Sequence, residues 1–154
     1  MPKQVGFLST EDYKTVLSCV PIPTVDFILV RQAPGGREFL LGKRTEEPYR
    51  GKWFVTGGRI NKNEQMADAV CRQVQRELGI TDGVITLVGC LDVMNPPKMG
   101  IPWHSIWHFH TIAVAPDAVI TPNKENKKVK WFSHVNPRWP LPVRQALAMA
   151  GFSK

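Results

Sequence analysis

Apolar residues recur along the chain with two different periods, and these periods predict an alternation of strands and helices. A step of four separates Met66, Val70, Val74 and Leu78, the spacing of one face of an α-helix, and Gly79 follows as a helix terminator. Elsewhere, short runs rich in β-branched and aromatic residues predict strands at 24–30, 37–44, 51–58, 85–93, 105–115 and 128–134.

Two further helices are marked by capping and proline signals, one across residues 9–21 and one across residues 142–151. A Pro-Gly-Gly turn at 34–36 joins the first two strands. The segment 94–102, MNPPKMGIP, holds three prolines and predicts a flexible lid or rim. Strands interleaved with three helices predict an α/β fold, and no repeat or linker interrupts residues 1–154, which we interpret as one domain.

The charge balance favours an anionic partner, because 20 Lys and Arg residues exceed 13 Asp and Glu residues. The basic residues are scattered rather than clustered, which favours a small anion such as a nucleotide over nucleic acid or a membrane surface. No apolar run reaches 18 residues, and no basic start precedes an apolar stretch, so we expect neither a transmembrane segment nor a secretory signal. Three cysteines without CxxC spacing predict free thiols and a cytoplasmic location.

The candidate chemistry lies in the stretch GGRINKNEQMADAVCRQVQRELGI, residues 57–80. Gly57 and Gly58 form a turn that a ligand can approach closely, because no Cβ intervenes. Gln73, Arg76 and Glu77 then fall on one helix face, which we expect to be exposed. A glycine turn ahead of a helix with an acidic residue suits a Mg²⁺–polyphosphate complex, because Mg²⁺ prefers oxygen ligands and substrate phosphates. An ordinary surface helix of mixed charge is the alternative.

The order and spacing of these residues resemble the Nudix box. The resemblance rests on Gly58, Glu64, Arg72 and the run Glu77-Leu78-Gly79-Ile80. It implies the Nudix fold, in which a mixed β-sheet is sandwiched between α-helices.

Two of the acids that the Nudix box normally carries are replaced in this chain. The Arg-Glu pair of the box becomes Arg72-Gln73, and its Glu-Glu pair becomes Arg76-Glu77. These replacements are similar to losses tolerated by the GDP-mannose mannosyl hydrolases, a subfamily that keeps the final glutamate. The segments STEDYKTVL, TVDFILV and EFLLGKRTEEPYRGKWFVTGGRI also resemble that subfamily.

The resemblance implies a Mg²⁺-dependent hydrolase, with Mn²⁺ as an alternative ion, that cleaves the sugar C1–O bond of GDP-mannose or a related nucleotide sugar. It also implies a homodimer. Attack at the anomeric carbon requires a good leaving group, and one Mg²⁺ with several arginines can stabilise the departing diphosphate. The alternatives are a pyrophosphohydrolase that cleaves P–O bonds in nucleoside diphosphate derivatives, and a nucleotide-sugar sensor without turnover.

The resemblance also assigns roles to individual positions. It implies that catalysis uses Arg59, Arg72 and Glu77. It implies that the substrate contacts Asp26, Arg44, Arg59 and Phe109, and that metal is held by the Gly57 carbonyl, Glu77 and Glu125. Structural alternatives stay open: Arg72 pairs with Glu64, Arg44 is a solvated strand end, and Asp26 is a strand-end carboxylate.

The general base is the least defined part of this hypothesis. The subfamily has a histidine at the position of Asn126, and an amide does not accept a proton near pH 7. His104 is the first substitute candidate. His108 and His110 alternate on a strand, so they share a face, which we interpret as a substrate-facing wall with aromatic residues behind it.

Overall fold

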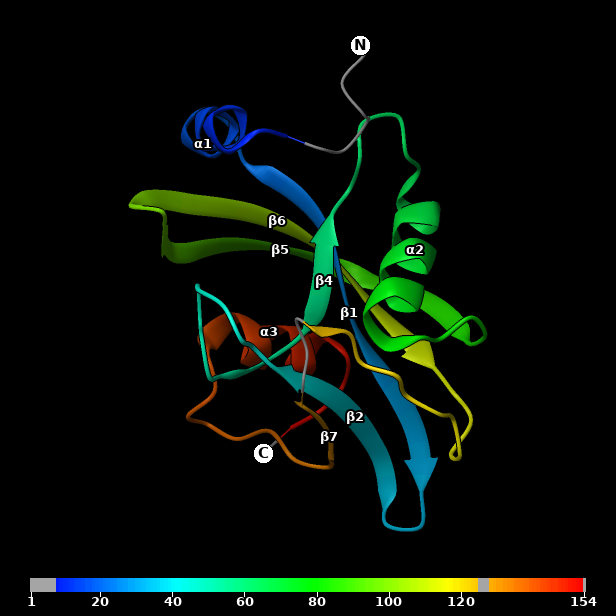
Figure 1. Ribbon diagram of the computed structural model, residues 1–154. Helices are drawn as coiled ribbons and strands as arrows, with labels where there is room; N and C mark the ends of the chain where they lie inside the picture. The colour runs from blue at the N-terminus through cyan, green and yellow to red at the C-terminus, as the bar shows by residue number, and fades with distance from the viewer. Residues whose placement is uncertain (1–7, 125–127, 154) are drawn as a thin grey trace.

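Strand β1 (Ile22–Ala33) is the centre of the sheet and pairs with three other strands in the computed structural model, which describes residues 8–124 and 128–153. It runs parallel to β6 (Ile101–Ala113) and antiparallel to two strands on its other edge. The first half of β1 pairs with β4 (Thr56–Arg59) and the second half with β2 (Gly36–Lys43). Strands β4 and β2 therefore follow one another along the same edge of β1 (Figure 1).

The remaining strands extend the sheet at its two edges. On one side β2 pairs with β3 (Trp53–Phe54) and β7 (Lys128–Phe132), and on the other side β6 pairs with the edge strand β5 (Val84–Lys98). The mixture of one parallel and several antiparallel pairs confirms the predicted mixed sheet.

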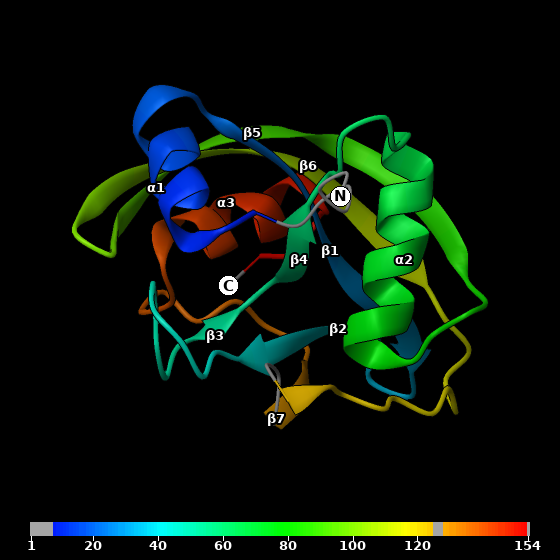
Figure 2. The same cartoon turned by 45° about the horizontal axis from the view of Figure 1, so that its top comes forward.

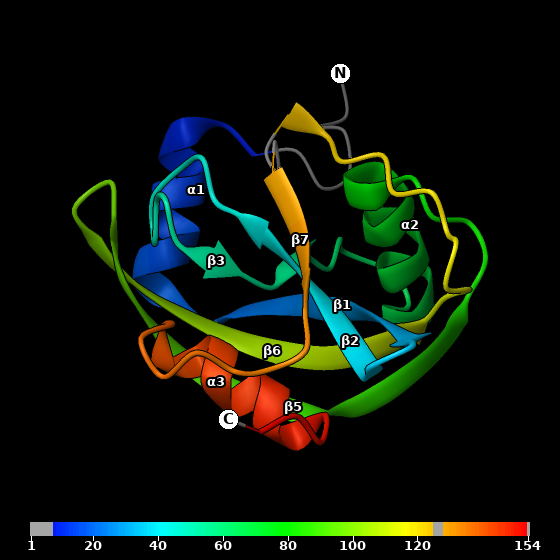
Figure 3. The ribbon, with the colours of Figure 1, turned by 90° about the horizontal axis from the view of Figure 1, so that it is seen from below.

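Helices cover both faces of this sheet, because β1 carries apolar side chains on both of its faces. Val25, Phe27 and Leu29 pack on one face against α2 (Met66–Leu78). Ile28 and Val30 lie in the core on the other face, together with residues of α3 (Leu141–Met149). Figure 3 shows α2 and α3 on opposite sides of the strands. Because β1 is buried on both faces, its sequence is almost continuously apolar.

The first helix forms where its capping signal predicts. α1 (Thr10–Cys19) starts after Ser9, whose side-chain oxygen accepts a hydrogen bond from the Asp12 backbone N–H at 3.1 Å. Figure 2 shows β4 between α1 and α2. Over residues 8–124 and 128–153, no helix combines the length and apolar composition that crossing a bilayer requires.

Two local predictions of secondary structure are wrong. The segment 94–102 is mainly strand rather than loop, because β5 and β6 form one long hairpin whose turn lies at residues 99–100. Pro96 and Pro97 are accommodated at a register shift in β5, where an edge strand leaves one side unpaired, and Pro102 lies near the start of β6. The strand predicted at 51–58 is two short strands, β3 and β4, that pair with different neighbours.

Gly57 allows β4 to approach β1 at the site of interest. A Cβ at this position would lie 2.3 Å from the Val25 carbonyl oxygen and 2.6 Å from Asp26 Oδ1. Both contacts are far shorter than van der Waals separation, and the first involves backbone that cannot move aside. Glycine is therefore required for the pairing of Gly57 with Asp26.

We expect Gly57→Ala to lower the free energy of unfolding by about 2 kcal/mol, because the added methyl group forces the two strands apart. Gly35→Ala is the matched control, since no atom lies within 4 Å of a Cβ built there. Urea denaturation of both variants measures the difference. Equal effects at the two positions would contradict this account of the β1–β4 contact.

Candidate functional site

A cavity of about 570 Å³ opens where the sheet divides, with walls from α1, β1, β4, α2 and the β5–β6 hairpin. Basic side chains outnumber acidic ones in this wall. Among the described residues, the basic ones are Arg44, Arg59, Arg72, Arg76 and Lys98, and the acidic ones are Asp26 and Glu46. The excess of positive charge suits an anionic ligand.

Arg72 is fixed by Glu64, as the structural alternative for this arginine predicted. Its Nε donates to Glu64 Oε1 at 2.6 Å, and its Nη2 donates to Glu64 Oε2 at 2.8 Å and to the Arg59 carbonyl at 3.1 Å. Glu64 also accepts a hydrogen bond from the Asn61 backbone N–H at 2.8 Å. The hydrogen bond from Arg72 holds the pKa of Glu64 below its ordinary value. This network attaches the loop after β4 to α2 and places Arg72 in the cavity wall.

The other two predicted arginines enter the cavity from different elements. Arg44 follows β2, and its Nε donates to the Pro48 carbonyl at 2.6 Å, so it is positioned by the loop rather than solvated at a strand end. The Arg59 guanidinium lies 5.0 Å from the ring centroid of Tyr13. The structure therefore brings Arg44, Arg59 and Arg72 to one cavity, as expected for a site that binds phosphate.

The helix face that carries Gln73 and Glu77 is buried, which corrects the prediction that it is exposed. Gln73 is 3% exposed and Glu77 is 1% exposed. Arg76 remains half exposed, and its Nη2 lies 2.5 Å from Glu77 Oε1. Because an unpaired buried carboxylate is costly, this ion pair offsets part of the cost of burying Glu77.

Glu77 and Gly57 meet at a second, smaller cavity of about 50 Å³, which shares Arg44, Glu46 and Gly57 with the larger one. The donors there are hard oxygen atoms: the Glu77 carboxylate, the Glu46 carboxylate and a backbone carbonyl. Mg²⁺ is commonly bound through one or two carboxylates and completes its shell with water and phosphate oxygens. These residues fit one Mg²⁺ in that form.

The described ranges 8–124 and 128–153 contain no cluster of three His, Cys, Asp or Glu side chains that could hold a metal ion on their own. A metal bound here would therefore depend on ligand oxygens and water. The predicted metal ligand Glu125, and Asn126 at the expected position of the base, lie outside the described residues.

Asp26 is buried at the centre of β1 and lines the larger cavity. Burial raises its pKa to about 7, while the hydrogen bond from the Thr24 hydroxyl and the charge of Arg44 oppose this shift. Asp26 therefore lies in the wall as predicted, in the middle of a strand rather than at a strand end.

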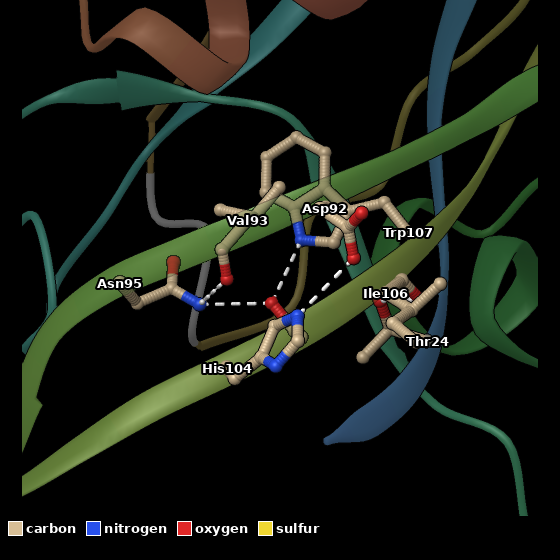
Figure 4. A network of polar contacts seen from close by, with 8 residues as sticks. Thr24, Asp92, Val93, Asn95, His104, Ile106 and Trp107 are labelled. Carbon is tan, nitrogen blue, oxygen red and sulfur yellow. Dashed lines mark hydrogen bonds and ion pairs between the residues drawn. The ribbon is translucent and has the colours of Figure 1, made fainter.

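Phe109 does not reach the cavity, which corrects its assignment as a substrate contact. It is fully buried in the core on the α3 side of the sheet. Trp103, Ser105 and Trp107 occupy the preceding positions of the same strand face and do line the cavity. Figure 4 shows the side chains of Asn95 and Trp107 close together, where both donate to the Ser105 hydroxyl, at 2.8 and 3.2 Å.

The histidines of β6 lie on the opposite strand face, so the predicted histidine wall is wrong. His108 Nδ1 bonds to the Thr24 carbonyl at 3.0 Å, and His110 Nδ1 bonds to the His108 carbonyl at 2.7 Å. His104 Nε2 lies 3.2 Å from Asp92 Oδ1 on the neighbouring strand (Figure 4). None of the three lines the cavity.

Two buried polar atoms in the described part of the chain lack a hydrogen-bond partner, and both belong to residues of the cavity wall. They are Gln73 Oε1, an acceptor, and Trp103 Nε1, a donor. Buried polar groups are nearly always paired, so an orphan donor and acceptor in one cavity point to a polar ligand or ordered water. Sequence reasoning missed Trp103, although its alternation with Ser105 and Trp107 was a usable signal.

The comparisons with known proteins are consistent with this geometry. Residues 21–149 match the NUDIX domain. A curated relative, the low-salt glycan biosynthesis protein Agl8 of Haloferax volcanii, is 35% identical over 82 residues. That alignment covers 53% of this chain and 50% of Agl8, so the match spans about half the length of this relative.

Two solved structures share the fold. The NUDIX domain of Shewanella oneidensis NrtR, in complex with ADP ribose, has a TM-score of 0.66 and 18% identity, covering 94% of this chain and 97% of that chain. The MutT NUDIX hydrolase of Burkholderia pseudomallei has a TM-score of 0.61 and 23% identity, covering 82% and 97%. At these identities the likeness concerns the fold alone.

The burial of His110 predicts a pH-dependent stability. Burial lowers its pKa below the ordinary value, so unfolding allows this histidine to take up a proton below about pH 6.5. Its contribution to stability is therefore complete above that pH and is lost as the pH falls further. We expect His110→Gln to reduce the decline in unfolding free energy between pH 7 and pH 5 by up to about 1.4 kcal/mol per pH unit.

Urea denaturation across this pH range provides the measurement. The raised pKa of Asp26 contributes a slope of opposite sign, because a folded-state carboxyl that retains its proton gains stability as the pH falls below about 7. Both proteins keep Asp26, so its effect cancels in the comparison. Parallel curves for wild type and His110→Gln would contradict the prediction.

Proposed function

The chain belongs to the Nudix family of hydrolases, which act on derivatives of nucleoside diphosphates, and we propose that its substrate is a nucleotide sugar such as GDP-mannose, cleaved with Mg²⁺ at the sugar C1–O bond. Support for a sugar-linked role comes from the resemblance to GDP-mannose mannosyl hydrolases and from the glycan-biosynthesis role in the name of Agl8. The proposed enzyme is a homodimer, by the same resemblance.

The observation that carries this proposal is the charge of the cavity. Five basic and two acidic side chains of the described residues line it, and the buried Glu77 and Gly57 both line the adjoining space. Activation of water for attack on phosphorus commonly uses two metal ions held by several carboxylates. Departure of a diphosphate from carbon needs stabilisation of negative charge, which arginines supply directly.

The proposed reaction breaks the bond between sugar C1 and the diphosphate oxygen. A water oxygen forms the new bond to C1, the bonding electron pair leaves with the nucleoside diphosphate, and the water proton passes to solvent or to a base. Arg44, Arg59 and Arg72 hold the diphosphate and stabilise the charge that develops on the leaving oxygen.

Divalent ions such as Mg²⁺ or Mn²⁺ generally serve Nudix hydrolases, and here the ion would be held by Glu77 and the Gly57 carbonyl and would supply further positive charge to the diphosphate. Glu125 is proposed as a third ligand from outside the described residues. Asp26 is proposed to accept hydrogen bonds from sugar hydroxyl groups, because its carboxylate lies in the cavity wall between Thr24 and Gly57.

Product analysis in heavy-oxygen water tests the bond that is broken. A panel of nucleotide sugars is incubated with Mg²⁺, and the products are separated and weighed by mass spectrometry. We expect nucleoside diphosphate plus free hexose, with the heavy oxygen in the hexose and none in the nucleotide. Nucleoside monophosphate plus sugar phosphate would instead show cleavage at P–O, and binding without any product would indicate a sensor.

A further inference from the structure

We propose that Arg76, held in place by the buried Glu77, binds the diphosphate directly, so that the cavity retains a nucleoside diphosphate without any divalent cation. The inference rests on the proposed function, because it concerns how the same site holds the same class of ligand. It separates two tasks: binding of the diphosphate by side chains, and cleavage of the bond with Mg²⁺.

The position of the Arg76–Glu77 pair carries the inference. The Glu77 side chain is 2% exposed and faces the smaller cavity, whereas Arg76 is 51% exposed and lines the larger one. Their ion pair of 2.5 Å spans the boundary between the two spaces. A guanidinium group in the wall of the larger cavity is therefore joined directly to the carboxylate that is proposed to hold the metal.

Glu77 prepares Arg76 for binding in two ways. A free arginine side chain loses conformational entropy when it is immobilised on a ligand, and prior fixation by a buried partner reduces that loss. The pairing with Glu77 involves Nη2, and the planar guanidinium has a geometry that matches phosphate oxygens. Arg76 is thus a preorganised donor at the cavity wall.

Gln73, one helical turn before Arg76, supports the same conclusion. Its side chain is buried against Gly58, lines the larger cavity, and has an Oε1 atom without a partner. This surface of α2 therefore presents an amide and a guanidinium to the ligand. If carboxylates replaced both Gln73 and Arg76, the net charge of this surface would fall by three. Such a surface would repel a diphosphate in the absence of metal ions.

The other basic side chains of the cavity act in the same direction and outnumber its two acidic residues, Asp26 and Glu46. Arg44, Arg59 and Lys98 belong to other elements and surround the same space. Together with Arg76 they supply the positive charge that a diphosphate requires. Metal-free binding therefore follows from side chains that the fold already holds in place.

Calorimetric titration of the full chain with GDP, in EDTA and then in Mg²⁺, tests the inference. We expect wild type to bind GDP in EDTA with an affinity within about tenfold of that in Mg²⁺. Arg76→Gln should weaken binding in EDTA by about tenfold to a hundredfold, the usual effect of losing a charged hydrogen bond. Arg76→Lys should retain part of the affinity, and the exposed Arg138→Gln is the matched control.

A charge reversal sharpens the test. In Arg76→Glu, binding in EDTA should be lost, and Mg²⁺ should restore it, because two neighbouring carboxylates then need a metal to hold an anion. Thermal unfolding of each variant shows whether the protein remains folded. If Arg76→Glu does not fold, the comparison is made with Arg76→Lys.

Two outcomes distinguish the inference from the function on which it rests. If wild type binds GDP only with Mg²⁺, or if Arg76→Gln binds in EDTA as wild type does, the inference is overturned while nucleotide-sugar hydrolysis stands. If wild type neither binds GDP nor hydrolyses any nucleotide sugar under either condition, both the proposed function and the inference are overturned.

Discussion

The burial of one carboxylate, Glu77, is the constraint on which the candidate site depends. A charged group at 1% exposure is stable only with a close partner, and Arg76 supplies that partner from the next position of the same helix. The pair places a cation in the wall of the main cavity and a carboxylate in the smaller cavity that Gly57 also lines. Both the proposed metal site and the proposed diphosphate contact follow from this arrangement.

The site lies beside β1, where two different strands, β4 and β2, pair with one edge of the central strand. Because β4 and β2 occupy successive halves of one edge of β1, the chain between them opens a space beside the central strand. Gly57 allows β4 to approach Asp26, and the Glu64–Arg72 pair attaches the following loop to α2. Basic residues from separate parts of the sequence thereby line one cavity.

The sequence predicted most of the scaffold, because periodicity reports which face of an element is buried. Val70, Val74 and Leu78 are buried in α2 as their spacing indicated, the order of elements predicted an α/β fold, and the resemblance to the Nudix box implied the mixed sheet. Periodicity could not show that a second face, with Gln73 and Glu77, is also buried, since Gln73 packs against Gly58 of the distant strand β4.

The errors at the site have a similar origin. Prolines in residues 94–102 suggested a loop because the edge position of β5 depends on long-range pairing. Alternation on β6 correctly separated the histidine face from the aromatic face, but it could not tell which of them lines the cavity. Phe109 and Trp107 share a strand face, yet Trp107 lines the cavity whereas Phe109 is fully buried in the core. Which residues of a strand line a cavity and which lie in the core depends on the assembled fold.

The dependence of turnover on Mg²⁺ in Glu77→Gln tests the account most directly, because Glu77 is the buried acid on which the site is built. Initial rates of nucleotide-sugar hydrolysis are measured against Mg²⁺ concentration for wild type, Glu77→Gln and the exposed control Glu47→Gln, with thermal unfolding recorded for each. The account predicts saturable Mg²⁺ activation in wild type and the control, and at least about a hundredfold lower turnover in a folded Glu77→Gln. An unchanged Mg²⁺ dependence in Glu77→Gln would contradict it.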